Sequence, residues 1–200
     1  GDADHLVATP NGIYAHTGKS GVWHCTVKKV EENGEVRYEA HWKQVIKKAP
    51  GGGYDLKGTT VYDSKRNRLV GVANDKAMTI IDLNTMTVKQ LKPKRGRIAH
   101  YREAAYIPDQ DVIFAPNGYK KKGYSVYRCA ANKWVGVDIP SPVVEYTHRG
   151  KTHRKVQMDA GEDTVIKYDP RHKILFRYGL GSTVHVMRYD DKIVKTAQEP

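Results

Sequence analysis

Three basic stretches of the sequence combine side chains that could bind an acidic sugar and move protons on it. They are KPKRGRIAHYR at 92–102, NGYKKKGY at 117–124 and SPVVEYTHRGKTHRK at 141–155. An arginine guanidinium can hold a carboxylate or a sulfate through two parallel hydrogen bonds, and a nearby histidine or tyrosine can take up and deliver protons. The catalytic candidates are His100, Tyr101, His148 and His153, and the substrate-binding candidates are Arg97, Arg102, Lys121, Arg149 and Arg154.

The chemistry that this combination would support is β-elimination from a uronic-acid sugar. A cation neutralises the C6 carboxylate, so that the C5 proton becomes more acidic. A base then removes that proton, and an acid protonates the leaving oxygen. The alternative is that these basic residues form an ordinary solvated surface, where lysine and arginine are common.

Metal and nucleophile chemistry have less support. His148 and His153 are five residues apart and His16 and His24 are eight apart, but neither pair has the further Cys or His spacing of a zinc site. No metal site is assigned, and no cofactor is predicted, although a divalent metal stays open. The sequence contains no glycine-rich phosphate loop, nucleophile elbow or metalloprotease motif.

The charge of the chain indicates its class of partner. Its 200 residues carry a formal net charge of +12, which favours polyanions: an acidic polysaccharide, an acidic protein, nucleic acid or an acidic membrane surface. Nucleic acid has the weakest support, because the tyrosines have the spacing of core residues rather than of stacking platforms. No apolar run approaches the roughly 20 residues of a membrane-spanning helix.

The cysteines and the start of the chain indicate little about the chemistry or the compartment of the protein. Cys25 and Cys129 are too few for a disulfide scaffold or a cysteine zinc site, so two buried thiols or a single disulfide both stay open. The chain begins GDADHLVATP, without a signal peptide or an initiator Met. We expect it to be processed or excised from a longer chain, with a secreted or periplasmic location if it acts on carbohydrate.

The elements that must position these residues are predicted by a repeat. The nonapeptides YDSKRNRLV (62–70), YIPDQDVIF (106–114) and YDPRHKILF (168–176) each join a Tyr, a polar turn and an apolar triplet. Their starts are 44 and then 62 residues apart, which indicates a repeat with an insertion in its last interval. An alternating apolar run, a polar turn and a second run follow each nonapeptide. Each unit therefore predicts four antiparallel strands, with first strands near 58–63, 102–107 and 163–168.

Four-stranded units that repeat every 40–50 residues are typical of propeller blades. The chain resembles kelch-like blades and the galactose-oxidase central-domain type of β-propeller, well over 54–196 and weakly over 5–49. The double glycine of kelch blades is replaced by AND, PNG and YGLG, and no copper ligand set can be placed. The residues that carry the resemblance are Tyr62, Asp63, Asp82, Thr85, Tyr106, Pro108, Trp134, Tyr168, Asp169 and Pro170.

The resemblance implies an all-β fold, a β-propeller of four-stranded antiparallel blades, with about four blades or part of a larger ring. We expect one propeller or propeller fragment over 1–200. Its blades would span 5–49, 54–95, 98–140 and 158–196, with a long inter-blade insertion at 141–157. The expected strands of the first blade are HLVAT, GIYAHT, GVWHCTVKK and VRYEAHWKQVIKK, with a hairpin turn at ENGE (32–35), and the last blade ends with the run KIVK at 192–195. Trp134, Val135 and Val137 are expected in an outer strand, with Trp134 buried.

In such a fold the three basic stretches would open on one face, since blade-to-blade connections and second-to-third-strand loops share that face. Some polysaccharide lyases that act on acidic polysaccharides are propellers with His, Tyr and Arg in the active site. We therefore expect a carbohydrate-active propeller that binds a uronic or sulfated polysaccharide, and that acts as a lyase if it is an enzyme. The alternative is a non-catalytic scaffold that docks an acidic protein or nucleic acid.

Overall fold

The chain is built from β-strands in two compact units, Gly1–Lys92 and Pro93–Pro200. The structure is a computed structural model that describes residues 5–17, 21–47, 59–72, 78–92, 104–116, 124–137, 143–156, 165–178, 184–190 and 192. None of these residues is helical, so the described chain has no helix long and apolar enough to cross a membrane.

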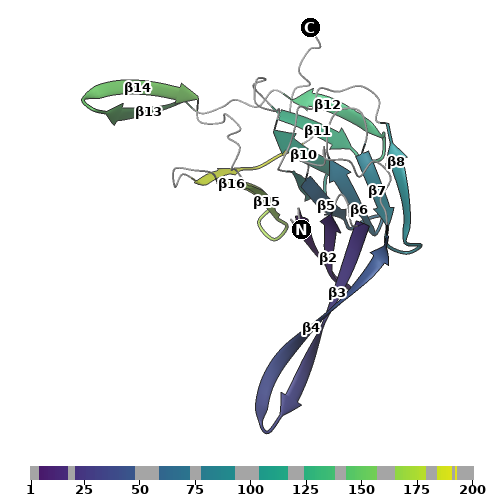
Figure 1. Ribbon diagram of the computed structural model, residues 1–200. Coiled ribbons are helices and arrows are strands. Elements are labelled where there is room, and N and C mark those ends of the chain that lie inside the picture. Colours follow the sequence, from purple (N-terminus) through teal and green to yellow (C-terminus); the bar gives the residue numbers. More distant parts are fainter. Residues whose placement is uncertain are drawn as a thin grey trace. The chain divides into compact units, whose positions relative to one another are not determined.

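Unit 1 holds two four-stranded antiparallel sheets whose strands pair in chain order. The strands of the first sheet are β1 (His5–Thr9), β2 (Gly12–Thr17), β3 (Gly21–Glu32) and β4 (Glu35–Ile46). Those of the second are β5 (Thr59–Asp63), β6 (Arg68–Val72), β7 (Met78–Asp82) and β8 (Thr87–Leu91), whose order can be followed in Figure 1. The first strands, β1 and β5, lie beside each other, as the inner strands of neighbouring propeller blades do.

Unit 2 repeats this plan. Its first sheet has the order β12-β11-β10-β9, and the first strand of its last sheet, β15, lies beside β9. The strands of the first sheet are β9 (Ala105–Ile107), β10 (Val112–Pro116), β11 (Tyr124–Arg128) and β12 (Lys133–Val137). A two-stranded hairpin follows, β13 (Val143–His148) and β14 (Lys151–Val156), and then a sheet of β15 (Val165–Asp169), β16 (Ile174–Tyr178) and β17 (Val184–Met187).

The predicted fold class, all-β with four-stranded antiparallel blades of the β-propeller type, is confirmed, and the first strands lie where they were expected. The kelch-like subtype, the domain boundaries and the number of blades in a ring stay predictions. The insertion at 141–157, interpreted from the sequence as a loop, contains the regular hairpin β13–β14. The run expected to complete the last blade, KIVK at 192–195, lies almost wholly outside the described residues.

The repeated nonapeptide forms the hairpin between the first and second strands of a sheet. Five residues after the position of its tyrosine, the backbone adopts a left-handed conformation, at Asn67 (φ 45°), Asp111 (φ 55°) and Lys173 (φ 56°). Asn and Asp tolerate this conformation better than most residues. The Tyr62 hydroxyl donates to Asn67 Oδ1 at 3.0 Å, and the Tyr106 hydroxyl donates to Asp111 Oδ1 at 3.1 Å. The tyrosine thus holds the residue that reverses the chain.

The same geometry recurs in the hairpins between third and fourth strands, where the sequence predicted a polar turn but not this tyrosine contact. Asn132 has a φ of 49° and its Oδ1 accepts a 2.7 Å hydrogen bond from the Tyr127 hydroxyl, while Met86 occupies the matching position with a φ of 52°. The spacing of Tyr and Asn in YRCAAN is the same as in YDSKRN, so the signal is present in the sequence.

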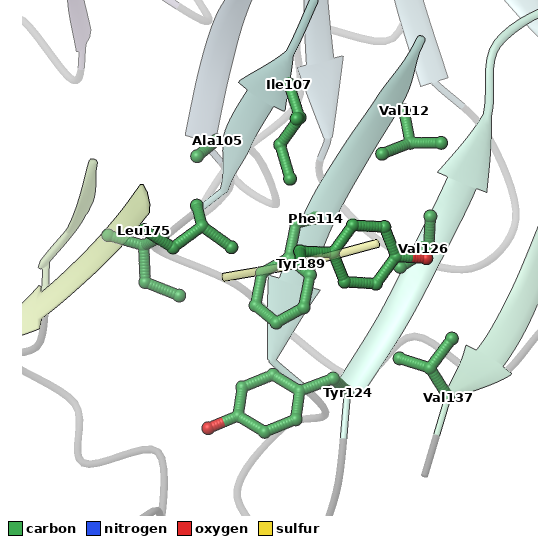
Figure 2. Packing of buried hydrophobic residues seen from close by; sticks show 10 residues of the cluster. Ala105, Ile107, Val112, Phe114, Tyr124, Val126, Val137, Leu175 and Tyr189 are labelled. Atoms are coloured by element: carbon green, nitrogen blue, oxygen red, sulfur yellow. The ribbon is translucent and has the colours of Figure 1, made fainter. Parts of the chain in front are cut away.

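Both cores are formed by the alternating apolar residues of these strands. Figure 2 shows the core of unit 2, where Leu175 of β16 and Tyr189 lie with residues of β9, β10, β11 and β12. The Phe114 ring is 4.9 Å from the Tyr124 ring and 5.5 Å from that of Tyr189, measured between centroids. Trp134, on the outer strand β12, is only 1% exposed, so its predicted position and burial are confirmed.

The core of unit 1 joins its two sheets. Its buried members are Val7, Tyr14, Val22, Ile46, Leu69, Ile81 and Leu83. A buried hydrogen bond of 3.1 Å also links His16 Nδ1 on β2 with Thr60 Oγ1 on β5. Cys25 and Cys129 are both buried free thiols, which is one of the two alternatives that the sequence left open.

Candidate functional site

The candidate residues divide between described and undescribed parts of the chain. Five of them lie outside the described residues: Arg97, His100, Tyr101, Arg102 and Lys121. The other four lie on the β13–β14 hairpin: His148, Arg149, His153 and Arg154. The predicted convergence of three loops stays a prediction, and the hairpin is the part of the candidate site whose geometry can be described.

The hairpin is closed by a two-residue turn. Arg149 has a φ of 50° and Gly150 a φ of 72°, and positive φ at both central residues is the mark of the type I′ turn that matches the twist of two antiparallel strands. Gly150 accommodates this conformation at no steric cost. The turn fixes the register of the strands and places the exposed Arg149 at the tip.

The register determines which residue positions are neighbours. Tyr146 pairs with His153, and His148 pairs with Lys151. Directly opposite residues occupy the same face of an antiparallel pair, and residues two apart along a strand share that face. The positions of both candidate histidines therefore fall on one face, together with a tyrosine and a lysine. Arg154 pairs with Glu145 and falls on the opposite face, so the hairpin does not group all four candidates.

The charge of the hairpin is strongly positive. Its 14 residues contain four cations, Arg149, Lys151, Arg154 and Lys155, against the single carboxylate of Glu145, for a net charge of +3 with histidine neutral. Exposed charges of one sign attract polyanions over about 8 Å at physiological salt, and of these cations Arg149 and Lys151 are exposed. The histidine and tyrosine positions beside the cations supply groups able to transfer protons.

A second polar group in unit 2 was not predicted as a site. The Tyr168 hydroxyl donates a short hydrogen bond to Asp109 Oδ1, which connects the end of β15 with the β9–β10 turn. Burial, reinforced by the hydrogen bond and charge of Asp109, raises the pKa of Tyr168 well above its ordinary value. Tyr168 is thus a protonated donor that joins β15 to the β9–β10 turn rather than a base. The sequence indicates that Tyr168 needs a different acceptor, because Lys173 stands where the other two repeats have the Asn or Asp that accepts the tyrosine hydroxyl.

Asp169 has a local role beside this contact. Its Oδ2 lies 2.6 Å from His172 Nδ1, and its Oδ1 accepts the backbone N–H of Arg171 at 2.8 Å. The hydrogen bond from His172 is the main reason that the pKa of Asp169 lies below its ordinary value. These contacts close the turn of the nonapeptide, so Asp169 has a structural role.

Two further histidines that could have been metal ligands have structural contacts. His24 Nε2 lies 2.8 Å from the Asn11 carbonyl oxygen, and its ring stacks on Tyr14 with 4.4 Å between centroids. His16 is held against Thr60 in the core of unit 1. Over the part of the chain that the structure describes, no three His, Cys, Asp or Glu side chains gather as metal ligands would.

Comparison with known proteins adds one structural likeness. No protein-family model matches the chain, and no curated protein matches it. A solved structure of Trypanosoma rangeli sialidase in complex with sialic acid is similar, with a TM-score of 0.41 and 10% sequence identity. The likeness covers 90% of this chain and 43% of the sialidase chain, so this chain spans less than half the length of that protein. The fold assignment rests on the strand order and register described above rather than on this likeness.

Proposed function

We propose that the protein binds an acidic polysaccharide, of the uronic or sulfated type, through the basic β13–β14 hairpin. The observation that carries the proposal is the register of this hairpin, which aligns histidine, tyrosine and lysine positions on one face of a ribbon with a net charge of +3. Residues two apart on a strand are about 7 Å apart. A polymer with repeated negative charges can therefore engage several cations at once, and linked contacts strengthen one another.

A linear polysaccharide fits this ribbon better than nucleic acid does. Single-stranded nucleic acid is usually held by exposed aromatic rings on which successive bases stack. In the described blades the tyrosines are largely core residues, with Tyr14, Tyr106, Tyr124 and Tyr127 all buried. Binding through cations alone is sufficient for a polysaccharide that carries a carboxylate or sulfate on each repeat.

The finer proposal is that the bound polymer is cleaved by β-elimination. Arg149 would neutralise the C6 carboxylate, and His153 beside Tyr146 would take the C5 proton. The electron pair of the C5–H bond would form the C4–C5 double bond as the C4–O bond breaks. His148 would protonate the departing oxygen. The predicted His100, Tyr101 and Arg102 stay alternative candidates for these roles.

Binding is tested by neutralising the tip of the hairpin. Arg149→Asn with Lys151→Gln removes two cations, and Asn tolerates the positive φ of position 149. Lys65→Gln with Lys89→Gln is the matched control, because it removes the same charge from exposed positions in unit 1. Each exposed ion pair is worth about 0.2–1 kcal/mol, so affinity for polygalacturonate should fall about 2-fold to 30-fold in the first variant. The effect should shrink as salt rises.

Cleavage is tested separately by the ultraviolet absorbance of the unsaturated product. His148→Ala and His153→Ala should each lose turnover while retaining binding. Salt-sensitive binding without turnover in any of the proteins would contradict the lyase and support a docking module. Equal binding by the hairpin variant and its control would show that the basic hairpin is only a solvated surface.

A further inference from the structure

The hairpin of β3 and β4 is far longer than its blade. Both strands have 12 residues, whereas β2 pairs with β3 only from Gly21 to Cys25. Residues 26–41, which we call the arm, therefore form a two-stranded ribbon, and Figure 1 shows this ribbon running well beyond the end of β2. Asn33 (φ 53°) and Gly34 (φ 80°) close it with a type I′ turn.

The arm has an exposed face on which apolar side chains lie beside Lys29 and Glu31. The register pairs Val27 with Ala40, Lys29 with Tyr38 and Glu31 with Val36, which places these residues on one face. Tyr38 is 70% exposed, Val27 54% and Val36 51%. Exposed apolar patches of this kind mark interaction sites more often than scattered single residues do.

The outer edge of the arm is also open. In the described sheet order β1-β2-β3-β4, β4 is the last strand. Its outward N–H and C=O groups can pair with another strand, because an unpaired strand edge is a template for strand addition. The arm thus has both the apolar face and the free edge that strand pairing requires.

We propose that β4 of the arm pairs antiparallel with β4 of a second copy of this chain, about a twofold axis that passes through Tyr38. The residues of β4 support this register by charge complementarity. Arg37 lies opposite Glu39 of the second copy, and Glu35 lies opposite His41, with each pair occurring twice. On the apolar face Val36 lies opposite Ala40 and Tyr38 opposite its own equivalent, so the two apolar faces become one continuous surface.

Neighbouring registers that keep the apolar faces together are less favourable, because like charges directly opposite destabilise a strand pair. Centring on Arg37 or on Glu39 sets that residue against its own equivalent. Centring on Ala40 sets Arg37 against Lys43. Centring on His41 sets His41 against itself and leaves only the Glu39–Lys43 pairs. Centring on Val36 also sets Arg37 against Glu35, but β4 begins at Glu35, so that register aligns only residues 35–37 of the strand. Among the longer registers of β4, charge therefore selects Tyr38 as the centre.

Stacking of two apolar faces is the competing mode of self-association. Stacking would bury Lys29 and Glu31, which lie on the same face as Tyr38 and are exposed in the single chain, and burying charged groups costs free energy. Edge pairing adds a ladder of backbone hydrogen bonds to the side-chain contacts. We therefore assign the edge, rather than the face, as the contact between copies.

The first test measures the mass of the full chain against concentration by sedimentation equilibrium. The wild type should show a monomer–dimer equilibrium. Tyr38→Lys places two ammonium groups together on the axis and should weaken dimerisation about 10-fold or more. Val27→Lys is the matched control on β3, away from the β4 edge, and should change the dissociation constant less than about threefold. A monomeric wild type, or equal weakening by the two variants, would overturn the proposal.

The second test uses charge exchange. Arg37→Glu and Glu39→Arg should each weaken the dimer about 10-fold, because each creates like-charge pairs across the axis. An equimolar mixture should restore a dimer that contains one copy of each variant, since every pair across the axis is then complementary. Arg37 and Glu39 also form an ion pair of 3.1 Å within one chain, but their side chains are 59% and 39% exposed, so folding should survive the loss of this pair, as circular dichroism would verify. A mixture that stays as monomeric as the separate variants would contradict the register.

Discussion

Replacing Asp63 with Ala should destabilise the protein more than the equivalent change at the end of β7. Asp63 ends β5 within the first nonapeptide, and its side chain has no exposed surface. Its Oδ2 accepts hydrogen bonds from Arg68 Nε at 2.7 Å and from Arg66 Nη1 at 3.1 Å. The Arg68 side chain is 12% exposed and that of Arg66 is 31% exposed, so the Arg68 contact dominates.

The magnitude follows from this geometry. Removing one partner of a buried ion pair costs about 3–5 kcal/mol, because the other charge stays buried without compensation. Solvent screening reduces the share of Arg66, so we expect Asp63→Ala to lower the free energy of unfolding by about 3 kcal/mol. With an m-value of about 2 kcal/mol per M, the urea midpoint should fall by about 1.5 M.

The assay is urea unfolding followed by tryptophan fluorescence. Asp82→Ala is the matched control, since Asp82 ends β7 in the same way but is partly exposed, and its Oδ1 accepts the backbone N–H groups of Asn84 (2.9 Å) and Thr85 (3.0 Å) rather than a buried arginine. That control should cost about 1 kcal/mol. Adding Arg68→Met to Asp63→Ala should recover part of the loss, because the uncompensated charge is then removed. A loss below about 1 kcal/mol in Asp63→Ala, or no recovery in the double variant, would refute the reasoning.

Three further changes test the turns. Tyr127→Phe should lower the free energy of unfolding by about 1 kcal/mol, because it leaves Asn132 Oδ1 without its 2.7 Å hydrogen bond; an unchanged urea midpoint would contradict this. Met86→Gly should raise the free energy of unfolding by about 0.5 kcal/mol, because glycine adopts the positive φ of position 86 without strain and this gain exceeds its entropy cost. A lower free energy of unfolding would contradict this expectation. Because the pKa of Asp169 is lowered chiefly by His172, Asp169 should stabilise the fold above the ordinary aspartate pKa and lose this effect as pH falls through the lowered value. In NMR titrations His172→Ala should move that pKa upward, and an unmoved pKa would contradict the assignment.

The alternation of apolar residues predicted most of the fold. The strands of the first blade, expected at HLVAT and GIYAHT, match β1 and β2, although the family resemblance was weakest there. Burial of alternate residues selects this pattern directly, since a strand with one buried face must alternate. For the same reason the burial of Trp134 could be predicted from its place in an apolar run.

The two hairpins outside the blades were harder to interpret. The β13–β14 segment is rich in Lys, Arg and His, so its alternation of apolar and polar residues is weak. Its turn is Arg-Gly rather than Asn-Gly, which is the stronger sequence signature of a hairpin. The sequence predicted a hairpin over the arm, but it did not predict that this hairpin extends beyond the other strands of its blade. Alternation shows that a residue belongs to a strand, whereas the number of neighbouring strands depends on where β2 ends. Local sequence does not contain that information.

The candidate site could be predicted only as a set of residue types. Histidine, tyrosine and arginine indicate a class of chemistry, but grouping them requires loops that are distant in sequence. The hairpin register groups His148 and His153 and separates Arg154, a result that no composition argument could supply.

Hydrogen exchange of the full chain, measured by mass spectrometry with and without a uronic-acid polymer, tests the proposed binding site most directly. We predict that the polymer slows amide hydrogen exchange in residues 143–156. This slowing should disappear in high salt or in the Arg149→Asn/Lys151→Gln variant. Residues 26–41 of the arm should be unchanged and serve as the internal reference. Protection that is absent from 143–156, or that persists unchanged in the variant, would contradict the assignment of this hairpin as the polysaccharide-binding site.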